Sequence, residues 1–238
     1  LEFRRVLFRS YFIEPGSGYL ACGYVAKGRM EEPMQILSVI NKFFTQQKNV
    51  VKSSFSGKRA LVTAGPTVEV IDPVRYVSNR SSGKMGYAIA EALRDKGAIV
   101  TLISGPTHLS LPEGINVVKV ESADDMFQAV TERFAKQDIV IKAAAVSDYT
   151  PMDILEHKLK KQEGGLSVQF KRTKDILKYL GENKTHQYLV GFAAETQNIE
   201  QYALDKLKRK NADVIISNNV GDTSIGFSSD DNELTMHF

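Results

Sequence analysis

Cysteine, histidine and long apolar runs are all scarce in this sequence, and each shortage excludes a class of protein. The single cysteine, Cys22, cannot form a disulfide within the chain, so the sequence does not require an oxidising compartment. No apolar run approaches the ~20 residues that a membrane-spanning helix needs. The four histidines are scattered and lack the spacing of metal ligands. We therefore expect a soluble, cytoplasmic protein without membrane contact.

The sequence also has only a small excess of positive over negative charge. The 31 Lys and Arg residues against 28 Asp and Glu leave a formal net charge of +3 in 238 residues. Nucleic-acid-binding proteins usually concentrate basic residues in stripes or tails, so this balance predicts small phosphorylated ligands rather than nucleic acid. Hydrophobic residues make up 42% of the chain and charged residues 25%. That composition is typical of a folded domain and excludes disordered, collagen-like and disulfide-scaffold chains.

Three short segments precede the main domain. Residues 1–10 mix arginines with apolar residues, as a targeting peptide would, but no signal-peptide cleavage site follows them. We therefore interpret them as a non-native or truncated terminus. Residues 11–44 contain a glycine-rich loop and then a helical pattern that begins at Pro33. Residues 45–57 are polar and predict a linker. The main domain then covers residues 58–238, and we expect its C-terminus to be truncated because the chain ends within a predicted strand.

The main domain alternates short apolar runs with amphipathic segments. Residues 138–145 are nearly all apolar, as in a strand that is covered on both faces. Ser122 and Asp125 have the spacing of a capping box at the start of a helix. This alternation predicts an α/β fold, a Rossmann-like three-layer α/β/α arrangement with a mostly parallel sheet. In such sheets ligands bind beyond the carboxyl ends of the strands.

One loop stands out as a candidate anion site. Residues 78–86 read Ser-Asn-Arg-Ser-Ser-Gly-Lys-Met-Gly and open onto a helical pattern. Free backbone N–H groups at a helix N-terminus attract anions. The loop matches neither the Walker A pattern nor GxGxxG. From the pattern alone it is either an anion site or a capped helix start.

Six segments, in family order, resemble the phosphopantothenate–cysteine ligases. They are Gly65-Pro-Thr, Asp72-Pro-Val-Arg-Tyr, residues 78–86, Ala143-Ala-Ala-Val-Ser-Asp, Lys158-Leu-Lys-Lys and Gly191-Phe-Ala-Ala-Glu-Thr. Residues 21–30 resemble the substrate clamp of phosphopantothenoylcysteine decarboxylases, which bacteria commonly fuse ahead of the ligase. The resemblance implies that residues 11–44 are the C-terminal remnant of a decarboxylase domain, and we expect no decarboxylase activity from this chain alone. The resemblance implies a ligase of coenzyme A biosynthesis. It would join 4′-phosphopantothenate and L-cysteine through an acyl-cytidylate, consuming CTP with Mg²⁺ and releasing CMP and pyrophosphate.

The resemblance also implies roles for single residues. Asn79 would hold the acyl-cytidylate and Arg75 a substrate anion, and Cys22 matches the proton donor of the decarboxylase, whose FMN belongs to the decarboxylase half. The residues that match CTP-contacting positions are Lys142, Ala143, Ala144, Asp148, Lys158, Lys174, Asp175, Ile176, Leu177, Phe192, Lys206 and Lys210. Asp148 is also the candidate metal ligand. On the pattern alone, Asn79 fits a turn, Phe192 a core position, and Lys206 with Lys210 a solvated helix face.

The lysine-rich stretch 157–161 lies between a segment without helix or strand signal, 149–156, and two glycines, Gly164 and Gly165. Flexibility on both sides predicts a lid, with Lys158 as its phosphate contact. The alternative is an exposed basic loop.

Two other functions remain as alternatives. An NAD(P)-binding oxidoreductase would need GxGxxG after its first strand, where this chain has Gly65-Pro-Thr. A non-catalytic nucleotide-binding module would share the fold without the chemistry. The family resemblance further implies a homodimer through the ligase domain, and a larger assembly when the decarboxylase half is complete.

Overall fold

The computed structural model describes residues 13, 15–19, 23–50, 54–161, 164–195, 198–219 and 233–238. They belong to two compact units, residues 1–54 and 55–238, and each unit is described by itself. Among these residues, no helix is both long enough and apolar enough to cross a lipid bilayer.

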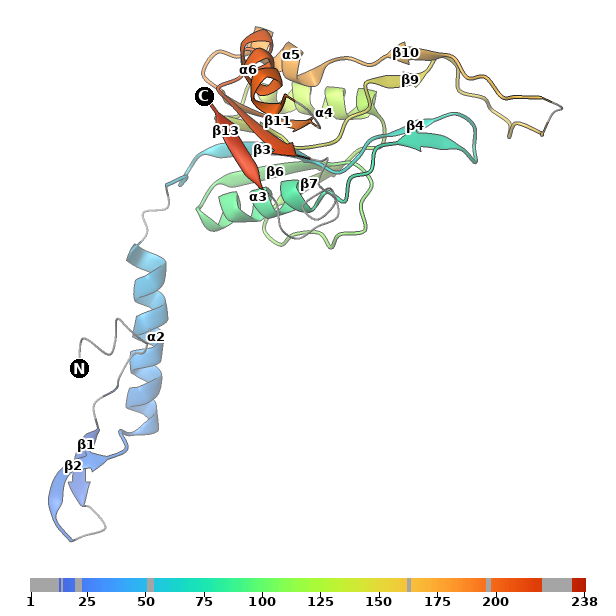
Figure 1. Cartoon of the computed structure of the whole chain (residues 1–238). Coiled ribbons are helices and arrows are strands. Elements are labelled where there is room, and N and C mark those ends of the chain that lie inside the picture. Colours follow the sequence, from blue (N-terminus) through green and yellow to red (C-terminus); the bar gives the residue numbers. More distant parts are fainter. Residues whose placement is uncertain are drawn as a thin grey trace. The chain divides into compact units, whose positions relative to one another are not determined.

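The first unit contains a hairpin and one long helix (Figure 1). Strands β1 (Gly16–Tyr19) and β2 (Val25–Arg29) pair antiparallel, and α2 spans Pro33–Val50. The helix begins at the predicted residue but continues past residue 44 into the predicted linker. Glutamine and lysine are good helix formers, so this polar stretch extends the helix instead of ending it. Cys22 lies outside the described residues.

The second unit is built on a seven-stranded sheet with the strand order β13-β12-β11-β8-β3-β6-β7. The strands are β3 (Arg59–Ala64), β6 (Ile99–Ser104), β7 (Asn116–Lys119), β8 (Ile139–Lys142), β11 (Tyr188–Glu195), β12 (Val214–Asn219) and β13 (Leu234–His237). All neighbouring pairs are parallel except β12 and β13. The predicted α/β class and mostly parallel sheet are confirmed.

Strand β8 is shorter than the apolar run 138–145 predicts. After Lys142 the chain turns across the end of β3, where the Ala144 N–H donates to Thr63 Oγ1 at 3.2 Å. The Ala145 N–H then donates to the Gly65 carbonyl at 2.9 Å. The backbone of this turn is therefore held against the end of β3, and the alanines lie at the carboxyl end of the sheet.

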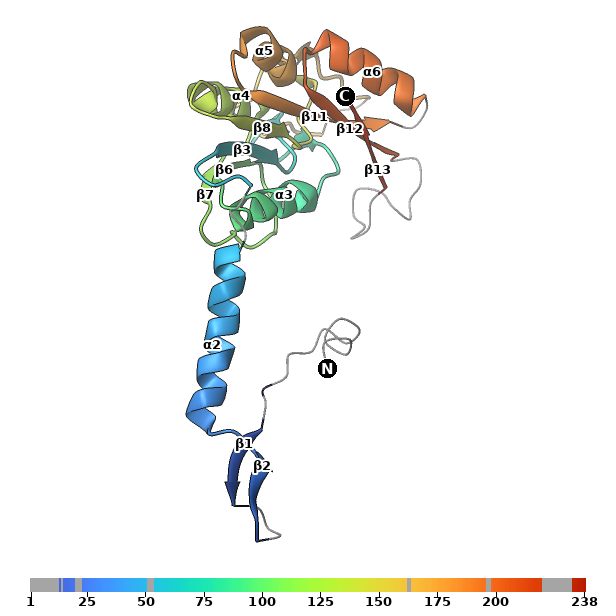
Figure 2. The same ribbon diagram turned by 90° about the vertical axis from the view of Figure 1, so that its left-hand side faces the viewer.

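Four helices cover the two faces of the sheet, as Figure 2 shows. Helix α3 (Lys84–Asp95) packs on one face, and α4 (Ala123–Phe134), α5 (Ile176–Asn183) and α6 (Ile199–Arg209) pack on the other. The core under α4, α5 and α6 is formed by alternate strand residues, among them Leu61, Ile103, Val140, Leu189 and Ile215. The opposite strand residues, Ala60, Val62 and Leu102, pack against α3.

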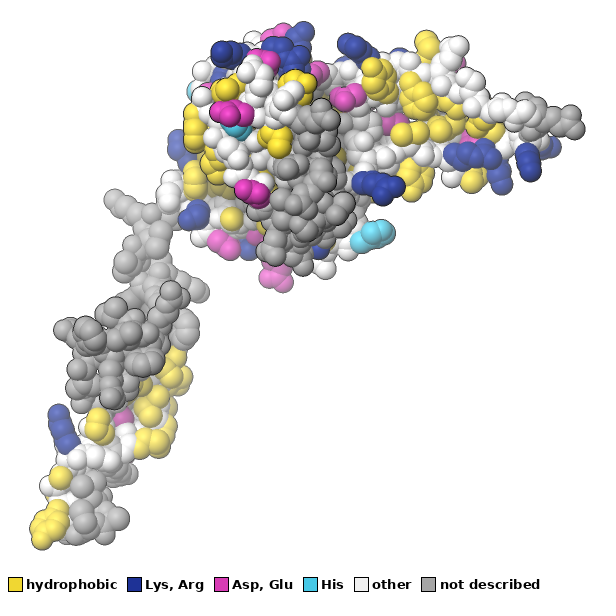
Figure 3. All heavy atoms as spheres, viewed as in Figure 1, with side chains coloured by type: hydrophobic (Ala, Val, Ile, Leu, Met, Phe, Trp, Pro, Cys, Tyr) yellow, Lys and Arg dark blue, Asp and Glu magenta, His cyan; other side chains and the backbone are white. Residues whose placement is uncertain are grey.

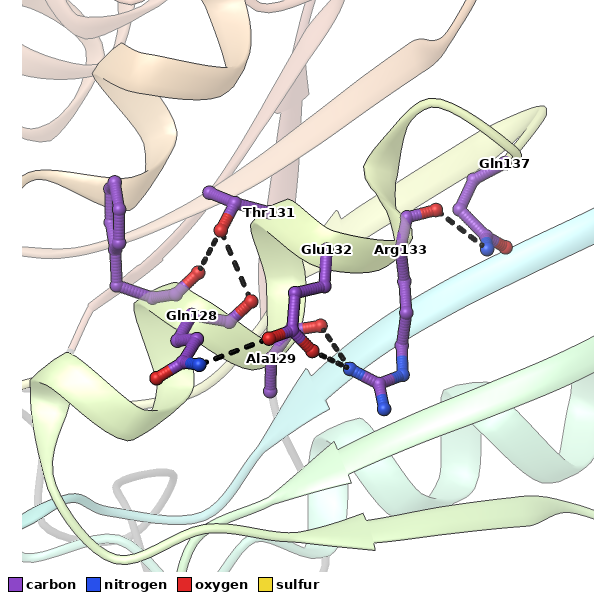
Figure 4. A network of polar contacts seen from close by, with 7 residues as sticks. Gln128, Ala129, Thr131, Glu132, Arg133 and Gln137 are labelled. Atoms are coloured by element: carbon purple, nitrogen blue, oxygen red, sulfur yellow. Dashed lines mark hydrogen bonds and ion pairs between the residues drawn. The ribbon is translucent and has the colours of Figure 1, made fainter.

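Helix α4 is held by side-chain hydrogen bonds at its start and along its outer face. Ser122 Oγ accepts from the Asp125 N–H at 3.1 Å, and the Asp125 carboxylate accepts from the Ser122 N–H at 2.9 Å, which confirms the predicted capping box. Along the outer face, Gln128 Nε2 donates to Glu132, and just beyond the end of the helix the buried Gln137 Nε2 donates to the Arg133 carbonyl (Figure 4). Side-chain hydrogen bonds therefore hold both ends of the helix.

Two short strand pairs that the sequence analysis did not predict extend from the carboxyl edge of the sheet (Figure 1). Strand β4 (Val68–Val70) pairs with β5 (Tyr76–Ser78), and β9 (Tyr149–Pro151) pairs with β10 (Phe170–Arg172). We call the described residues of 68–78 and 149–172 the arm. It exposes apolar side chains, visible in Figure 3, including Val74, Tyr76, Tyr149, Met152, Ile154, Leu166 and Phe170.

Candidate active site

A cleft with two lobes lies at the carboxyl ends of β8 and β11. The first lobe has a volume of about 560 Å³ and the second about 480 Å³. The residues that line both lobes are Lys142, Ala144, Val146, Asp148, Phe192 and Lys206. We call the first the α5 lobe and the second the α3 lobe, after the helix that begins at each. The position agrees with the rule for parallel sheets.

The α3 lobe is lined by the candidate anion loop. Residues 79–86 form one wall, and Asn79 Nδ2 donates to the Ala145 carbonyl at 3.0 Å. Gly83 is the N-cap of α3, with a φ of 80° that favours glycine. A Cβ on Gly86 would lie 2.5 Å from that of Ala64, so only glycine lets the helix start approach β3 this closely. The backbone N–H groups at the start of α3 are therefore placed beside the cleft.

The α5 lobe gathers most of the residues that match CTP contacts. It is lined by Lys142, Ala144, Asp148, Lys174, Asp175, Ile176, Leu177, Phe192, Lys206 and Lys210, while Ala143 lines the α3 lobe. The sequence therefore predicted most of the residues that the fold brings together here. Phe192 is half-buried within β11 and lines both lobes, so it is more than a core residue.

Three lysines make this lobe cationic. Lys206 Nζ donates to the Phe192 carbonyl at 2.8 Å, and Lys210 pairs with Asp175. Burial, together with the nearby ammonium groups of Lys206 and Lys210, lowers the pKa of Lys142 to about 8, although Asp175 and Asp148 oppose the shift. A group of like charges held in a partly buried lobe favours a polyanionic ligand.

Asp175 organises the floor of the α5 lobe. It is the N-cap of α5, and its Oδ1 accepts from the Lys178 N–H at 2.9 Å. Burial raises its pKa, but the Lys210 ammonium and the Lys178 N–H outweigh this effect and hold the pKa of Asp175 below its ordinary value. Lys174 lines this lobe, and its Nζ lies 2.8 Å from an Asp124 carboxylate oxygen and 4.9 Å from the Phe127 ring centre. Its ammonium is thus engaged with α4.

Arg75 and Lys158 line neither lobe, although both were predicted as site residues. Both lie on the arm, where Arg75 Nη1 donates to Asp72 Oδ2 at 2.6 Å and to the Leu159 carbonyl at 3.2 Å. The Leu155 N–H also donates to the Ile71 carbonyl at 3.0 Å. The segment that leads to the lysines is therefore tied to β4 and β5, and is not flexible on both sides as the sequence suggested.

The cleft includes residues that the sequence analysis did not single out. Leu234 lines it and comes from the antiparallel strand β13. Arg80 and Val146 also line it, and they lie within segments that the sequence analysis marked without assigning them a role. Asn218 of β12 also lines the α3 lobe. Leu234 carried no signal, because its place depends on the pairing of β13 with β12.

Among the described residues, no three His, Cys, Asp or Glu side chains lie close enough together to hold a metal ion by themselves. Asp148 is exposed and lines both lobes. Mg²⁺ in nucleotide sites is usually held by one or two carboxylates together with substrate phosphates and water. A single free-standing carboxylate beside a cationic lobe fits that mode of binding.

Comparisons with known proteins agree with this geometry. A family model described as the DNA/pantothenate metabolism flavoprotein C-terminal domain matches residues 55–238. The chain is 53% identical over 228 residues to the coenzyme A biosynthesis bifunctional protein CoaBC of Bacillus subtilis, and 47% identical over 225 residues to that of Haemophilus influenzae. These matches cover 95% and 94% of this chain but 55% of each relative, so the chain spans about half their length.

Solved structures show the same similarity. A crystal structure of the C-terminal domain of a coenzyme A biosynthesis bifunctional protein CoaBC superposes with a TM-score of 0.67 and 48% sequence identity. The match covers 78% of this chain and 84% of that one.

Proposed function

Because this chain belongs to the DNA/pantothenate metabolism flavoprotein C-terminal domain family, we propose that it is a phosphopantothenate–cysteine ligase of coenzyme A biosynthesis. It joins 4′-phosphopantothenate to L-cysteine at the expense of CTP. The observation that carries the proposal is the two-lobed cleft: one lobe is cationic, the other is lined by a helix N-terminus and Asn79, and Lys142 and Asp148 line both.

The proposed reaction has two steps, and both take place where the lobes meet. A carboxylate oxygen of phosphopantothenate forms a bond to the α-phosphorus of CTP while the bond to pyrophosphate breaks. The amine of cysteine then forms a bond to the acyl carbon, loses a proton and displaces CMP. Two lobes with a shared wall suit this chemistry, because the nucleotide and the acid must meet at one point.

The α5 lobe is assigned to CTP. Lys142, Lys206 and Lys210 would neutralise the triphosphate and the charge that develops on the departing pyrophosphate. Lys210 is already paired with Asp175, so the carboxylate holds this ammonium in place before the nucleotide arrives. Phe192 would form a wall against the nucleotide. Mg²⁺ would be held by Asp148 together with the phosphates, and it would add further neutralisation of their charge.

The α3 lobe is assigned to the acid substrate. The N–H groups at the start of α3 suit the phosphate of phosphopantothenate. Asn79 is oriented by its bond to the Ala145 carbonyl, and its amide can donate to the acyl or phosphoryl oxygens from there. Ala143, Ala144 and Ala145 let the backbone approach the ligand closely because their side chains are small.

The proposal extends to assembly and location. Exposed apolar side chains on the arm, such as Tyr76 and Ile154, support a homodimer that associates through it, and the dimer would bring the arm residues Arg75 and Lys158 to a cleft. Free cysteine with a reduced thiol is a substrate, which suits the cytoplasm. FMN belongs to decarboxylase chemistry and is assigned to no described residue.

The oxidoreductase alternative is disfavoured by the first βα turn. A Cβ on Gly65 would lie 2.9 Å from Thr107 Cγ2, and one on Gly83 would lie 2.8 Å from the same methyl group. Thr107 therefore packs against the turn where a dinucleotide pyrophosphate would have to lie.

The proposed function is tested by mixing the purified chain with CTP, Mg²⁺, phosphopantothenate and cysteine. We expect release of pyrophosphate and CMP together with phosphopantothenoylcysteine. Without cysteine, a single turnover should still release pyrophosphate, because the acyl-cytidylate forms first. Pyrophosphate release that requires no phosphopantothenate, or no release at all, would refute the assignment.

A further inference from the structure

Asp72 is a buried carboxylate to which the proposed chemistry gives no role. It lies in the turn between β4 and β5, and its side chain is 0% exposed. Its Oδ1 accepts from the N–H groups of Val74 at 2.7 Å and Arg75 at 2.8 Å. Its Oδ2 accepts from Arg75 Nη1 at 2.6 Å and from the Leu159 N–H at 3.1 Å. Every donor around the carboxylate is therefore matched to one of its two oxygens.

These bonds join two parts of the arm that are far apart in the sequence. Asp72 accepts the N–H of Leu159, and Arg75 donates to the carbonyl of the same residue at 3.2 Å. The two bonds fix both polar groups of one peptide residue, so they set the direction of the backbone at that point. We call Asp72, Arg75 and Leu159 the clasp. Leu159 directly follows Lys158, so the clasp determines where the Lys158 side chain begins.

The Asp72 carboxylate of the clasp stays ionised at neutral pH. Burial raises the pKa of Asp72, but the N–H groups of Val74, Leu159 and Arg75 and the Arg75 guanidinium lower it to about 2. Asp72 is therefore ionised throughout the neutral range, and it retains both oxygens as acceptors.

Resting on the proposed function, we propose that Asp72 is the positioning residue for Lys158. Its carboxylate and the Arg75 guanidinium hold the backbone of Leu159. When the proposed dimer brings the arm to a cleft, the clasp then presents the Lys158 ammonium to the nucleotide phosphates in one defined place. Positioning matters in such a step because a displacement of about 1 Å can cost on the order of 10²-fold in rate. Arg75 then acts through the clasp, and its contribution is not limited to contact with a substrate anion.

The first test measures the arm itself and needs no activity. Asp72→Asn keeps the size of the side chain but replaces one acceptor oxygen with an NH₂ group, which cannot accept from Leu159 or Arg75. Asp138→Asn is the matched control: Asp138 accepts the Arg59 N–H at 2.8 Å and pairs with Lys58, at the opposite end of the sheet.

Limited digestion with trypsin, with the cut bonds identified by mass spectrometry, compares the two variants. We expect cleavage after Lys158, Lys160 and Lys161 to become at least about fivefold faster in Asp72→Asn. In that variant the loop can open without the loss of the clasp hydrogen bonds, so local opening costs less free energy. Asp138→Asn should cleave there at the wild-type rate. An unchanged rate in Asp72→Asn would overturn the clasp. If Asp72→Asn does not fold, Arg75→Lys replaces it, because a single ammonium cannot bridge Asp72 and the Leu159 carbonyl.

The second test is a double-mutant cycle on kcat for pyrophosphate release. Asp72→Asn should lower kcat about tenfold or more in the wild-type background, with the KM for CTP changed much less. In the Lys158→Ala background it should cost less than about twofold, because Asp72 acts through Lys158. Equal losses in both backgrounds would overturn the positioning role and leave a general structural effect. If the wild-type chain releases no pyrophosphate, the proposed function fails, while the trypsin comparison still confirms or overturns the clasp.

Discussion

We expect Lys142 to support nucleotide binding in the cleft and, at the same time, to lower the free energy of unfolding. Its pKa is lowered to about 8 from an ordinary value of 10.5, mainly by burial and then by Lys206. Because the pKa in the folded state lies below that in the unfolded state, the cost of holding the charge is complete below pH 8. It declines as the pH rises from about 8 to 10.5, and it is absent above that range. At 1.36 kcal/mol per pKa unit, the cost at pH 7 is about 3 kcal/mol as an upper limit.

We predict that Lys142→Met stabilises the protein and impairs nucleotide use. Methionine is unbranched and apolar, so it fills the same space without the charge. Since Lys142 is partly exposed in the cleft, water screens part of the cost, and we expect a gain of about 1–2 kcal/mol at pH 7. For a chain of this size, that raises Tm by about 2–8 °C. The KM for CTP should rise about tenfold or more, because a cation at the shared wall is lost.

Thermal and urea unfolding at pH 7 and about pH 9.5 measure this effect. The gain should fall by about half or more at the higher pH, because the wild-type lysine is then largely neutral in the folded state. Lys136→Met, at an exposed lysine just after α4, is the control and should change stability by less than about 0.5 kcal/mol at either pH. Destabilisation by Lys142→Met at pH 7, or a gain that does not depend on pH, would refute the reasoning.

The sequence predicted the sheet because parallel strands that are buried on both faces leave a strong signal. β8 lies within the apolar run 138–145, and the alternation of such runs with amphipathic segments predicted a mostly parallel sheet. The rule that ligands bind beyond the carboxyl ends then selected the residues that line the cleft, and the family resemblance named them. Neither argument required knowledge of long-range contacts.

The arm could not be predicted in the same way. Its strands are three residues long, and β9 contains Pro151, which is unusual within a strand. β9 pairs with β10 across an intervening segment, so no local turn signal marks the pair. Exposed apolar residues also break the alternation that identifies a half-buried strand. What holds the arm together is long-range pairing, which a local pattern does not contain.

The direction of long charged side chains also could not be predicted from the sequence. Lys174 matches a CTP contact and lines the α5 lobe, and its ammonium lies against Asp124 and Phe127 of α4, a helix about fifty positions earlier in the chain, a contact that the sequence did not predict. In the same way, Arg75 reaches Leu159 across the arm. Position along the chain identifies which residues are near the cleft, but the direction of a long charged side chain is decided by the element packed beside it.

Substitutions and substrate exchange test three further features of the cleft and the arm. Ser147 is buried, and its Oγ makes no hydrogen bond within the described structure. Ser147→Ala should therefore stabilise the protein by about 1 kcal/mol and raise Tm by about 2–4 °C. A lower Tm would show that the hydroxyl has a partner such as a bound water. The kcat/KM for CTP should exceed that for ATP by about 10²-fold or more, because a pocket built for one base rejects another that leaves its polar groups unpaired, and comparable values would contradict this. Lys158→Ala should leave the thermal melt unchanged but lower kcat by about 10²-fold or more, the usual cost of one charge-stabilising donor. Lys160→Ala and Lys161→Ala should cost much less, because only Lys158 matches a CTP-contacting position of the family. Small and equal losses in the three lysine variants, measured by steady-state kinetics, would show instead that this stretch is an exposed basic loop and that Lys158 has no part in the site.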